Sequence, residues 1–166
     1  MKPDPSVGVV REPRNKMNDV LEGGCLCGEV RYRASGRPAH GMICHCNTCQ
    51  KAAGSPVVAW VTFPTTSFDF VQGDPISFRS SPLVLRTFCG SCGTPLTYKH
   101  SKAAKTIDVT TCSFDEPDSL PPTHHSWLQD SVSWIRFDDS LPTYQTTSSE
   151  GVVAARSNKA LNADVE

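Results

Sequence analysis

Seven of the eight cysteines in this 166-residue chain lie in three short clusters. The clusters are Cys25-Leu26-Cys27, Cys44-His45-Cys46-Asn47-Thr48-Cys49 and Cys89-Gly90-Ser91-Cys92. A disulfide between cysteines this close is strained or closes almost no loop, whereas thiolates one or two residues apart can hold one tetrahedral ion. Seven ligands are too many for one zinc ion. The spacing therefore predicts a closed four-thiolate site and an open three-thiolate site, and only the open site leaves room for chemistry.

Length and charge narrow the classes of protein to consider. A chain of this length forms one domain with a sizeable core. The formal net charge of −1 gives no electrostatic reason to expect nucleic acid or an anionic membrane surface as a partner. The only apolar run near the N-terminus is Val7-Gly8-Val9-Val10, which is too short for a signal peptide. We therefore expect a cytoplasmic protein, without nucleic-acid or membrane partners, whose thiols stay reduced and bind metal.

Composition divides the chain into a central folded unit and two polar ends. Residues 1–19 are rich in proline, asparagine and charge, and residues 145–166 begin with a polar linker and carry no strong apolar stripe. We expect both ends to be flexible, which leaves residues 20–144 as one folded zinc domain.

Short runs of β-branched and aromatic residues dominate the central unit, separated by turn signals such as Gly73-Asp74-Pro75. We predict strands over residues 29–34, 57–63, 68–71, 76–79, 84–88, 95–98 and 106–110. One short helix is predicted over Asn47–Ala53, with Gly54 as its left-handed C-terminal cap. The pattern is typical of a mainly β fold, either an all-β sandwich or a folded sheet.

The first and third cysteine clusters are predicted to share one closed site. Cys89 and Cys92 lie between two predicted strands, so they would form the tip of a hairpin with glycines that permit a tight turn. If the backbone at Cys25 and Cys27 is extended, both side chains point to the same side and reach one ion. The pairing would join an early strand to a later hairpin.

The middle cluster would form the open site. Cys44, Cys46 and Cys49 run into the predicted helix, and Cys49 lies where the helix dipole favours a thiolate. Zinc with three thiolates carries a formal charge of −1, so it generates hydroxide poorly. We interpret these three cysteines as catalytic ligands that bind a substrate thiol and present its sulfur as a nucleophile.

Two alternatives use the same cysteines. In the first, Cys46, Cys49, Cys89 and Cys92 form a single zinc ribbon, and the remaining cysteines are merely buried. In the second, His45 or a neighbour fills the fourth position of the middle cluster, so that both ions are structural. The position of His45 between two ligands argues against the second alternative, because its side chain would point away from the ion.

Three further residues are candidates for substrate binding. Lys51 follows the middle cluster and could attract an anionic substrate, although a solvated lysine is the simpler interpretation. His125 and Trp127 belong to an aromatic and histidine-rich group that could form the wall of a pocket, or could only pack. Cys112 stands alone and is interpreted as a free buried thiol.

The cysteine motifs and their neighbours resemble those of a known family, the glutathione-dependent formaldehyde-activating enzymes, also called the CENP-V/GFA domain family. The resemblance covers residues 21–144 and rests on several ordered motifs. These are Gly23-Gly24-Cys25-Leu26-Cys27-Gly28, the run from Cys44 to Cys49 with Ala53-Gly54-Ser55-Pro56, Phe88-Cys89-Gly90-Ser91-Cys92-Gly93-Thr94-Pro95-Leu96, Ile107-Asp108-Val109-Thr110, His125-Ser126-Trp127 and Asp138-Asp139-Ser140-Leu141-Pro142.

The resemblance implies a β-tent fold, two zinc ions and a carbon–sulfur lyase activity. The structural zinc would be held by Cys25, Cys27, Cys89 and Cys92, and the catalytic zinc by Cys44, Cys46 and Cys49. The implied reaction is the reversible addition of the glutathione thiol to formaldehyde, which makes a small-molecule thiol the expected partner. Gln50 stands where family members often carry arginine, so a charged contact to a glutathione carboxylate would fall to Lys51.

Two other functions remain compatible with the sequence. One is a tailoring enzyme that acts on another sulfur-containing or carbonyl metabolite, because members of one fold differ widely in substrate. The other is a non-enzymatic, zinc-stabilised module that binds a protein. A deep pocket beside an open zinc site would favour an enzyme, and a pocket too wide for glutathione alone would favour the tailoring enzyme.

Overall fold

The computed structural model describes residues 20–150, and the predicted N-terminal arm and most of the predicted C-terminal tail lie outside that range. The one α-helix within these described residues, α1, spans Asn47–Ala53. The strands are β1 (Val20–Gly24), β2 (Arg31–Ser35), β3 (His40–Cys44), β4 (Val58–Pro64), β5 (Phe68–Gln72), β6 (Ile76–Ser81), β7 (Val84–Phe88), β8 (Pro95–His100), β9 (Thr106–Thr110) and β10 (His125–Ser126). Short 3-10 turns connect several of them, at Thr65–Ser67, Ser101–Ala103, Thr111–Ser113, Pro117–Ser119, Leu128–Asp130 and Ser148–Glu150. The prediction of a mainly β fold is confirmed.

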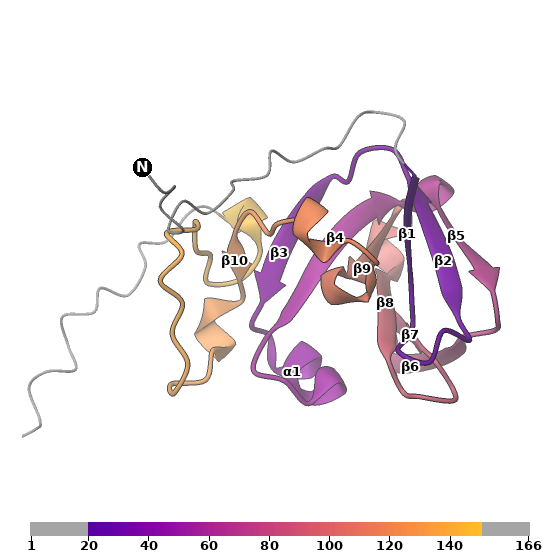
Figure 1. Cartoon of the computed structure of the whole chain (residues 1–166). Helices are drawn as coiled ribbons and strands as arrows, with labels where there is room; N and C mark the ends of the chain where they lie inside the picture. Colours follow the sequence, from indigo (N-terminus) through magenta and orange to yellow (C-terminus); the bar gives the residue numbers. More distant parts are fainter. Residues whose placement is uncertain (1–19, 151–166) are drawn as a thin grey trace, which may run out of the picture.

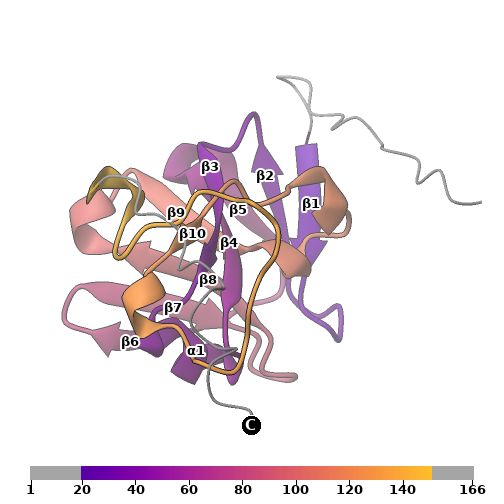
Figure 2. The ribbon, with the colours of Figure 1, turned by 90° about the vertical axis from the view of Figure 1, so that its left-hand side faces the viewer.

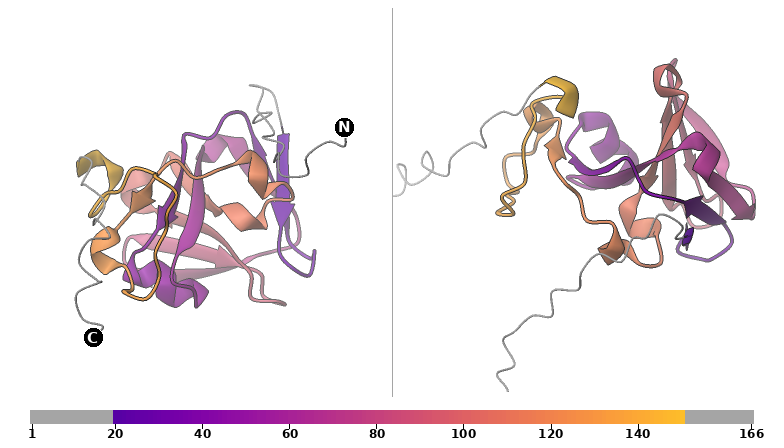
Figure 3. Two further views of the ribbon diagram at one scale, coloured as in Figure 1. Left: turned by 60° about the vertical axis from the view of Figure 1, so that its left-hand side comes forward. Right: turned by 90° about the horizontal axis from the view of Figure 1, so that it is seen from above.

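Two sheets make up the fold. A three-stranded sheet has the order β1-β2-β5, and a seven-stranded sheet has the order β10-β3-β4-β9-β8-β7-β6. All pairs are antiparallel except β10 with β3, which is parallel. The three-stranded sheet lies at one end of the molecule, and β10 with the segment after it lies at the other (Figures 1 and 3). The two faces of the seven-stranded sheet carry different clusters of buried side chains.

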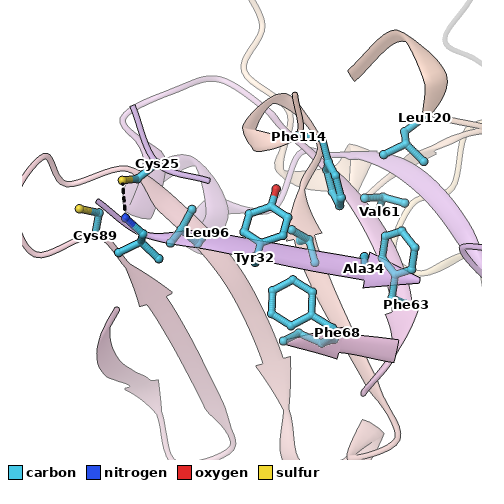
Figure 4. Close-up of a cluster of buried hydrophobic side chains, with 13 residues drawn as sticks. Cys25, Tyr32, Ala34, Val61, Phe63, Phe68, Cys89, Leu96, Phe114 and Leu120 are labelled. Carbon is cyan, nitrogen blue, oxygen red and sulfur yellow. Dashed lines mark hydrogen bonds between the residues drawn. The ribbon is translucent and has the colours of Figure 1, made fainter. Parts of the chain in front are cut away.

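One face of the seven-stranded sheet packs on the three-stranded sheet and forms the main core. Val61 and Phe63 of β4 meet Tyr32 of β2 and Phe68 of β5 there (Figure 4). Tyr32 is completely buried, and its hydroxyl lies 2.6 Å from Ser113 Oγ, so its polar atom is paired. A Cβ atom on Gly23 would lie 2.4 Å from that hydroxyl. Glycine is therefore needed where β1 passes over this ring.

The opposite face of the seven-stranded sheet positions the functional site. Residues i and i+2 of a strand share a face, so Trp60 projects away from the core that holds Val61. A row of side chains crosses neighbouring strands on this face, because Asp108 pairs with Tyr98, Tyr98 with Arg86, and Arg86 with Phe78. A second buried cluster forms on the same face around Trp60 and includes cysteines of the middle cluster.

Most predicted elements are present, and several have the predicted bounds. The helix spans Asn47–Ala53 and ends at Gly54, whose φ of 61° is the expected left-handed cap. Strands β7 and β9 begin and end at the predicted residues. The sequence analysis missed β1, β3 and β10, since β1 ends in two glycines, β3 starts with His40-Gly41, and β10 has two residues.

Backbone pairing continues beyond the predicted end of the domain at residue 144. The carbonyl of Gln145 accepts from the Gln129 N–H at 3.3 Å, and that of Thr146 accepts from the Trp127 N–H at 2.8 Å. The domain boundaries themselves stay predictions. Within residues 20–150, no helix has the length and apolar character required to cross a membrane.

Candidate metal centres and the cavity beside them

The first and third cysteine clusters come together at one end of the main core. Their four sulfur atoms lie within 4.8 Å of one another, with 3.5 Å between Cys25 Sγ and Cys27 Sγ and 3.8 Å between Cys27 Sγ and Cys89 Sγ. Tetrahedral zinc with bonds of about 2.3 Å would place its sulfur ligands about 3.8 Å apart. The fourth sulfur belongs to Cys92, so the four cysteines fit one zinc ion.

The local backbone explains why these sulfurs converge. The backbone at Cys25 and Cys27 is not extended, because this segment forms a turn in which the Gly28 N–H donates to the Cys25 carbonyl at 3.0 Å. Gly28 takes a φ of 77°, which strongly favours glycine. A turn brings two neighbouring sulfurs closer than a strand would, so the predicted ligand pair survives the change of conformation.

The third cluster is the tip of the β7–β8 hairpin, as predicted. The Cys89 N–H donates to the Thr94 carbonyl at 3.0 Å, and the Gly93 N–H donates to the Cys89 carbonyl at 2.9 Å. Cys25 and Cys89 are also members of the main core (Figure 4), and Cys25 Sγ accepts from the Val30 N–H at 3.2 Å. The group of four cysteines therefore has the features of a structural metal site, namely four possible ligands and two members that belong to the core.

The middle cluster forms a separate group of three sulfurs within 4.8 Å of one another. Cys44 ends β3, Cys46 caps the N-terminus of α1, and Cys49 lies in the first turn of that helix. The Cys49 N–H donates to Cys46 Sγ at 3.4 Å, so the helix cap is itself a ligand. Because the two groups are distinct, the alternative of a single zinc ribbon is wrong.

The three thiols lie close enough together to influence one another's ionisation. Cys46 lies beside Cys44, and this contact raises the pKa of Cys44 while it lowers the pKa of Cys46 to about 2. Ionisation of one thiol thus opposes ionisation of the next. All three can be thiolates together only when positive charge lies among them, as a zinc ion would provide. The donor set therefore fits a metal site with three protein ligands.

His45 points away from the three sulfurs. Its Nε2 lies 2.9 Å from Nδ1 of His125, and His125 Nε2 lies 2.9 Å from Asp139 Oδ2. Burial, followed by the nearby His125, lowers the pKa of His45 to about 4, so the ring is neutral at pH 7. No ring nitrogen of His45 belongs to the group of metal-ligating atoms. The alternative in which His45 completes the site is therefore not supported.

Gln50 holds the loop that carries the three cysteines. Its Nε2 donates to the His45 carbonyl at 2.5 Å and to the Asp130 carbonyl at 3.0 Å. The carboxylate of Asp130 accepts from the Asn47 N–H at 3.2 Å, which ties the start of α1 to the same segment. Sequence analysis treated Gln50 only as a lost arginine, but its contacts make it a support of the loop.

A cavity of about 590 Å³ adjoins the middle cluster and reaches Cys49. It lies between α1 and strands β4, β6 and β7, and Figure 2 shows α1 next to the ends of β6 and β7. Its apolar wall includes Val58, Trp60, Phe78, Phe88 and Pro95. The charged residues in the wall are both cations, Lys51 and Arg86.

Arg86 is a site residue that sequence analysis missed. It is only 9% exposed, and its Nη2 donates to Cys49 Sγ at 3.6 Å and to Thr48 Oγ1 at 3.5 Å. Its guanidinium carbon also lies 4.8 Å from the centre of the Tyr98 ring, which is a cation–π contact. The sequence signal that could have identified it is a charged residue on the same face of a predicted strand as the apolar residues Val84 and Phe88.

The three predicted substrate-binding residues occupy different places. Lys51 lies in the wall of the cavity with Cys49. His125 is buried and bonded to His45 and Asp139, and Trp127 packs against the cluster around Trp60. Neither His125 nor Trp127 lies in the cavity wall. Their roles in substrate binding stay predictions.

The remaining cysteine lies apart from both metal-ligating groups. Cys112 is exposed, whereas a buried thiol was expected, so that expectation is wrong. All eight cysteines belong to the described part of the chain, and all are free thiols there.

Comparison with known proteins identifies the family. The sequence profile described as "Glutathione-dependent formaldehyde-activating enzyme" matches residues 20–130. The chain belongs to this family. It is also 26% identical over 119 residues to an uncharacterized lyase of Schizosaccharomyces pombe, across 58% of this chain and 81% of that protein. A crystal structure of a Rhodobacter sphaeroides protein is similar with a TM-score of 0.49 and 17% identity, covering 57% of this chain and 87% of the other.

Proposed function

We propose that the protein is a zinc-dependent carbon–sulfur lyase that acts on glutathione or on a glutathione adduct of a small electrophile. The observation that carries this proposal is the position of the three-cysteine cluster at the wall of a cavity, with Cys49 belonging to both. Membership of the family and the similarity to a lyase support an enzyme of this kind. The separate four-cysteine site can serve the fold, which leaves the three-cysteine site for chemistry.

The three cysteines of the middle cluster would hold the catalytic zinc, which supplies an open coordination position for a thiol sulfur bound as its thiolate. Three thiolates leave the site with a formal charge of −1 and make it a poor generator of hydroxide. Arg86, bonded to Cys49 Sγ, offsets part of this negative charge. The residues therefore favour a thiolate nucleophile over an activated water.

The proposed reaction is the reversible addition of a thiol to an aldehyde. The sulfur forms a bond to the carbonyl carbon, the π electron pair moves to oxygen, and the proton released by the thiol ends on that oxygen. In reverse, the hydroxyl loses its proton, the carbonyl forms again, and the carbon–sulfur bond breaks with its electron pair on sulfur. Lys51 in the cavity wall would attract a carboxylate of glutathione, which orients the thiol toward the cysteines.

Two other functions are compatible with the same centres. A tailoring enzyme for a larger sulfur-containing or carbonyl metabolite is supported by the size and apolar wall of the cavity. A protein-binding zinc module would place no requirement on a cavity beside Cys49. The cavity therefore makes an enzyme the better proposal.

The test is a comparison of the zinc-loaded wild type with a Cys44→Ser, Cys46→Ser, Cys49→Ser triple variant. Exchange between glutathione, formaldehyde and their adduct is followed by NMR, and the triple variant should fall to the uncatalysed rate. Cys112→Ser is the matched control, because Cys112 is an exposed thiol outside both groups, and its rate should equal that of the wild type. A folded triple variant with wild-type turnover would disprove the mechanism.

A further inference from the structure

The wall of the cavity contains more apolar surface than formaldehyde chemistry requires. Val58 and Trp60 of β4 and Phe88 of β7 line one side, and Ala53 of α1 lines another. Formaldehyde and the hydroxymethyl group that it adds to glutathione carry no apolar substituent at the reacting carbon, so that carbon would gain little from such a surface. Small-molecule sites use apolar walls to bind apolar groups and a few polar residues to orient them. The wall therefore indicates a substrate with an apolar group near the reacting carbon.

Phe78 gives the strongest indication of such a group. Its side chain belongs to the cavity wall, yet it is 60% exposed. It lies on β6, the outer strand of the seven-stranded sheet, where an exposed aromatic side chain favours unwanted association. An aromatic ligand that covered the ring would remove this surface from water and would gain the preferred edge-to-face or offset-stacked geometry.

The charges of the cavity complement an anion attached to the apolar group. The wall contains Arg86 and Lys51 but no aspartate or glutamate. Within residues 20–150, Arg86 forms no ion pair with a carboxylate, although it is largely buried. Phe78 is the register partner of Arg86 on the neighbouring strand, so the aromatic and cationic surfaces are adjacent. One ligand can therefore contact both.

We infer that the electrophile is an aromatic or branched apolar aldehyde, and that its adduct with glutathione occupies this cavity. This inference rests on the proposed function. The reacting carbon would lie next to Cys49, its apolar substituent against Phe78, and a glutathione carboxylate near Arg86 or Lys51. The step is the same addition: the carbon–sulfur bond forms, the carbonyl π pair moves to oxygen, and the thiol proton ends there.

The experiment measures binding with two stable thioethers, S-methylglutathione and S-benzylglutathione, by calorimetry on the zinc-loaded full chain. Burial of the benzyl ring should make S-benzylglutathione bind about tenfold more tightly or better. Phe78→Ala should reduce this ratio to about threefold or less and leave S-methylglutathione unchanged. Ile76→Ala is the matched control, because Ile76 is an exposed apolar residue on the same strand outside the cavity wall, and it should keep the full ratio.

Each other outcome overturns a defined part of the inference. Equal binding of the two thioethers would disprove the apolar substituent while leaving the proposed lyase intact. A benzyl preference that survives Phe78→Ala would disprove the assignment of the group to this wall. If neither thioether binds and the wild type does not accelerate the exchange of glutathione with formaldehyde, the proposed function fails as well.

Discussion

The two cysteine groups have the same chemistry but different surroundings. The four-cysteine group joins the β1–β2 turn to the β7–β8 hairpin, and two of its members, Cys25 and Cys89, belong to the main core. The three-cysteine group lies between the end of β3 and α1, on the other face of the sheet, beside a cavity. Sulfur ligands alone therefore do not separate a structural site from a reactive one.

What separates the two groups is what lies beside each of them. In the first group the Val30 N–H donates to Cys25 Sγ, Cys25 and Cys89 belong to the main core, and four ligands would leave no free position on a zinc ion. The second group has three ligands, a buried cation at Cys49 and an opening toward the cavity. The number of possible ligands and the neighbouring charge are thus the features that differ between the two groups.

The largest effect is expected from Cys89→Ser. Cys89 is completely buried and belongs to the four-cysteine group, where metal binding would be coupled to folding, so its loss should lower the free energy of unfolding by more than about 5 kcal/mol. Urea unfolding followed by circular dichroism measures this. Cys112→Ser controls for the loss of a thiol and should unfold like the wild type. A Cys89→Ser protein with wild-type stability would remove the distinction between the two sites.

A smaller loss of stability is expected from the triple substitution of Cys44, Cys46 and Cys49 by serine. Zinc content by native mass spectrometry should fall from two ions to one, activity should disappear, and the free energy of unfolding should fall by only about 1–3 kcal/mol. The reason is that the main core and the four-cysteine site remain intact. If the triple variant unfolds, the second site is structural too.

Breaking the hydrogen bonds that join His45, His125 and Asp139 beside the three-cysteine group should have a moderate effect on metal binding. His125→Ala would leave His45 Nε2 buried without a partner and loosen the loop between Cys44 and Cys46. We expect about tenfold weaker zinc binding at the second site, measured by competition with a chelator, and unchanged binding at the first. His40→Ala, an exposed histidine away from both groups, is the control. An equal weakening at both sites would show a global effect instead.

The smallest expected effect is a pH dependence of stability that arises from His124, which is not among the possible metal ligands. Burial lowers the pKa of His124 below its ordinary value of 6.5, so the unfolded chain binds more protons than the native chain just below pH 6.5. The free energy of unfolding should therefore decrease as the pH falls through this range. His124→Phe keeps the ring that packs against Tyr144 and should have a shallower dependence. Unfolding at saturating zinc at several pH values tests this, and identical slopes would contradict it.

The predictions from the sequence succeeded where the signal was local. The grouping of the cysteines, the bounds of α1 and the Gly54 cap depend on residues within a few positions of one another, and the structure has all of them. The strands that were missed carry weak local signals, since β10 consists of two residues that pair with β3. Pairing with a distant strand, and not local propensity, makes such a segment a strand.

The roles of individual side chains at the site depended on contacts between distant parts of the chain. Arg86 and Cys49 are 37 residues apart, and His45 and His125 are 80 apart. The strand register brings Arg86 to the cavity, and the parallel pairing of β10 with β3 brings His125 to His45. Neither register can be read from residue spacing, because it is selected by packing of the whole sheet.

The sequence by itself indicated that seven cysteines divide into two groups of possible metal ligands in a mainly β domain, because thiolate spacing and strand periodicity are properties of short segments. Only the tertiary structure decided that Arg86 lies at Cys49 and that Phe78 and Lys51 share a cavity with them. The physical reason is that a cavity and its charge exist only once separate strands have paired and buried their side chains together.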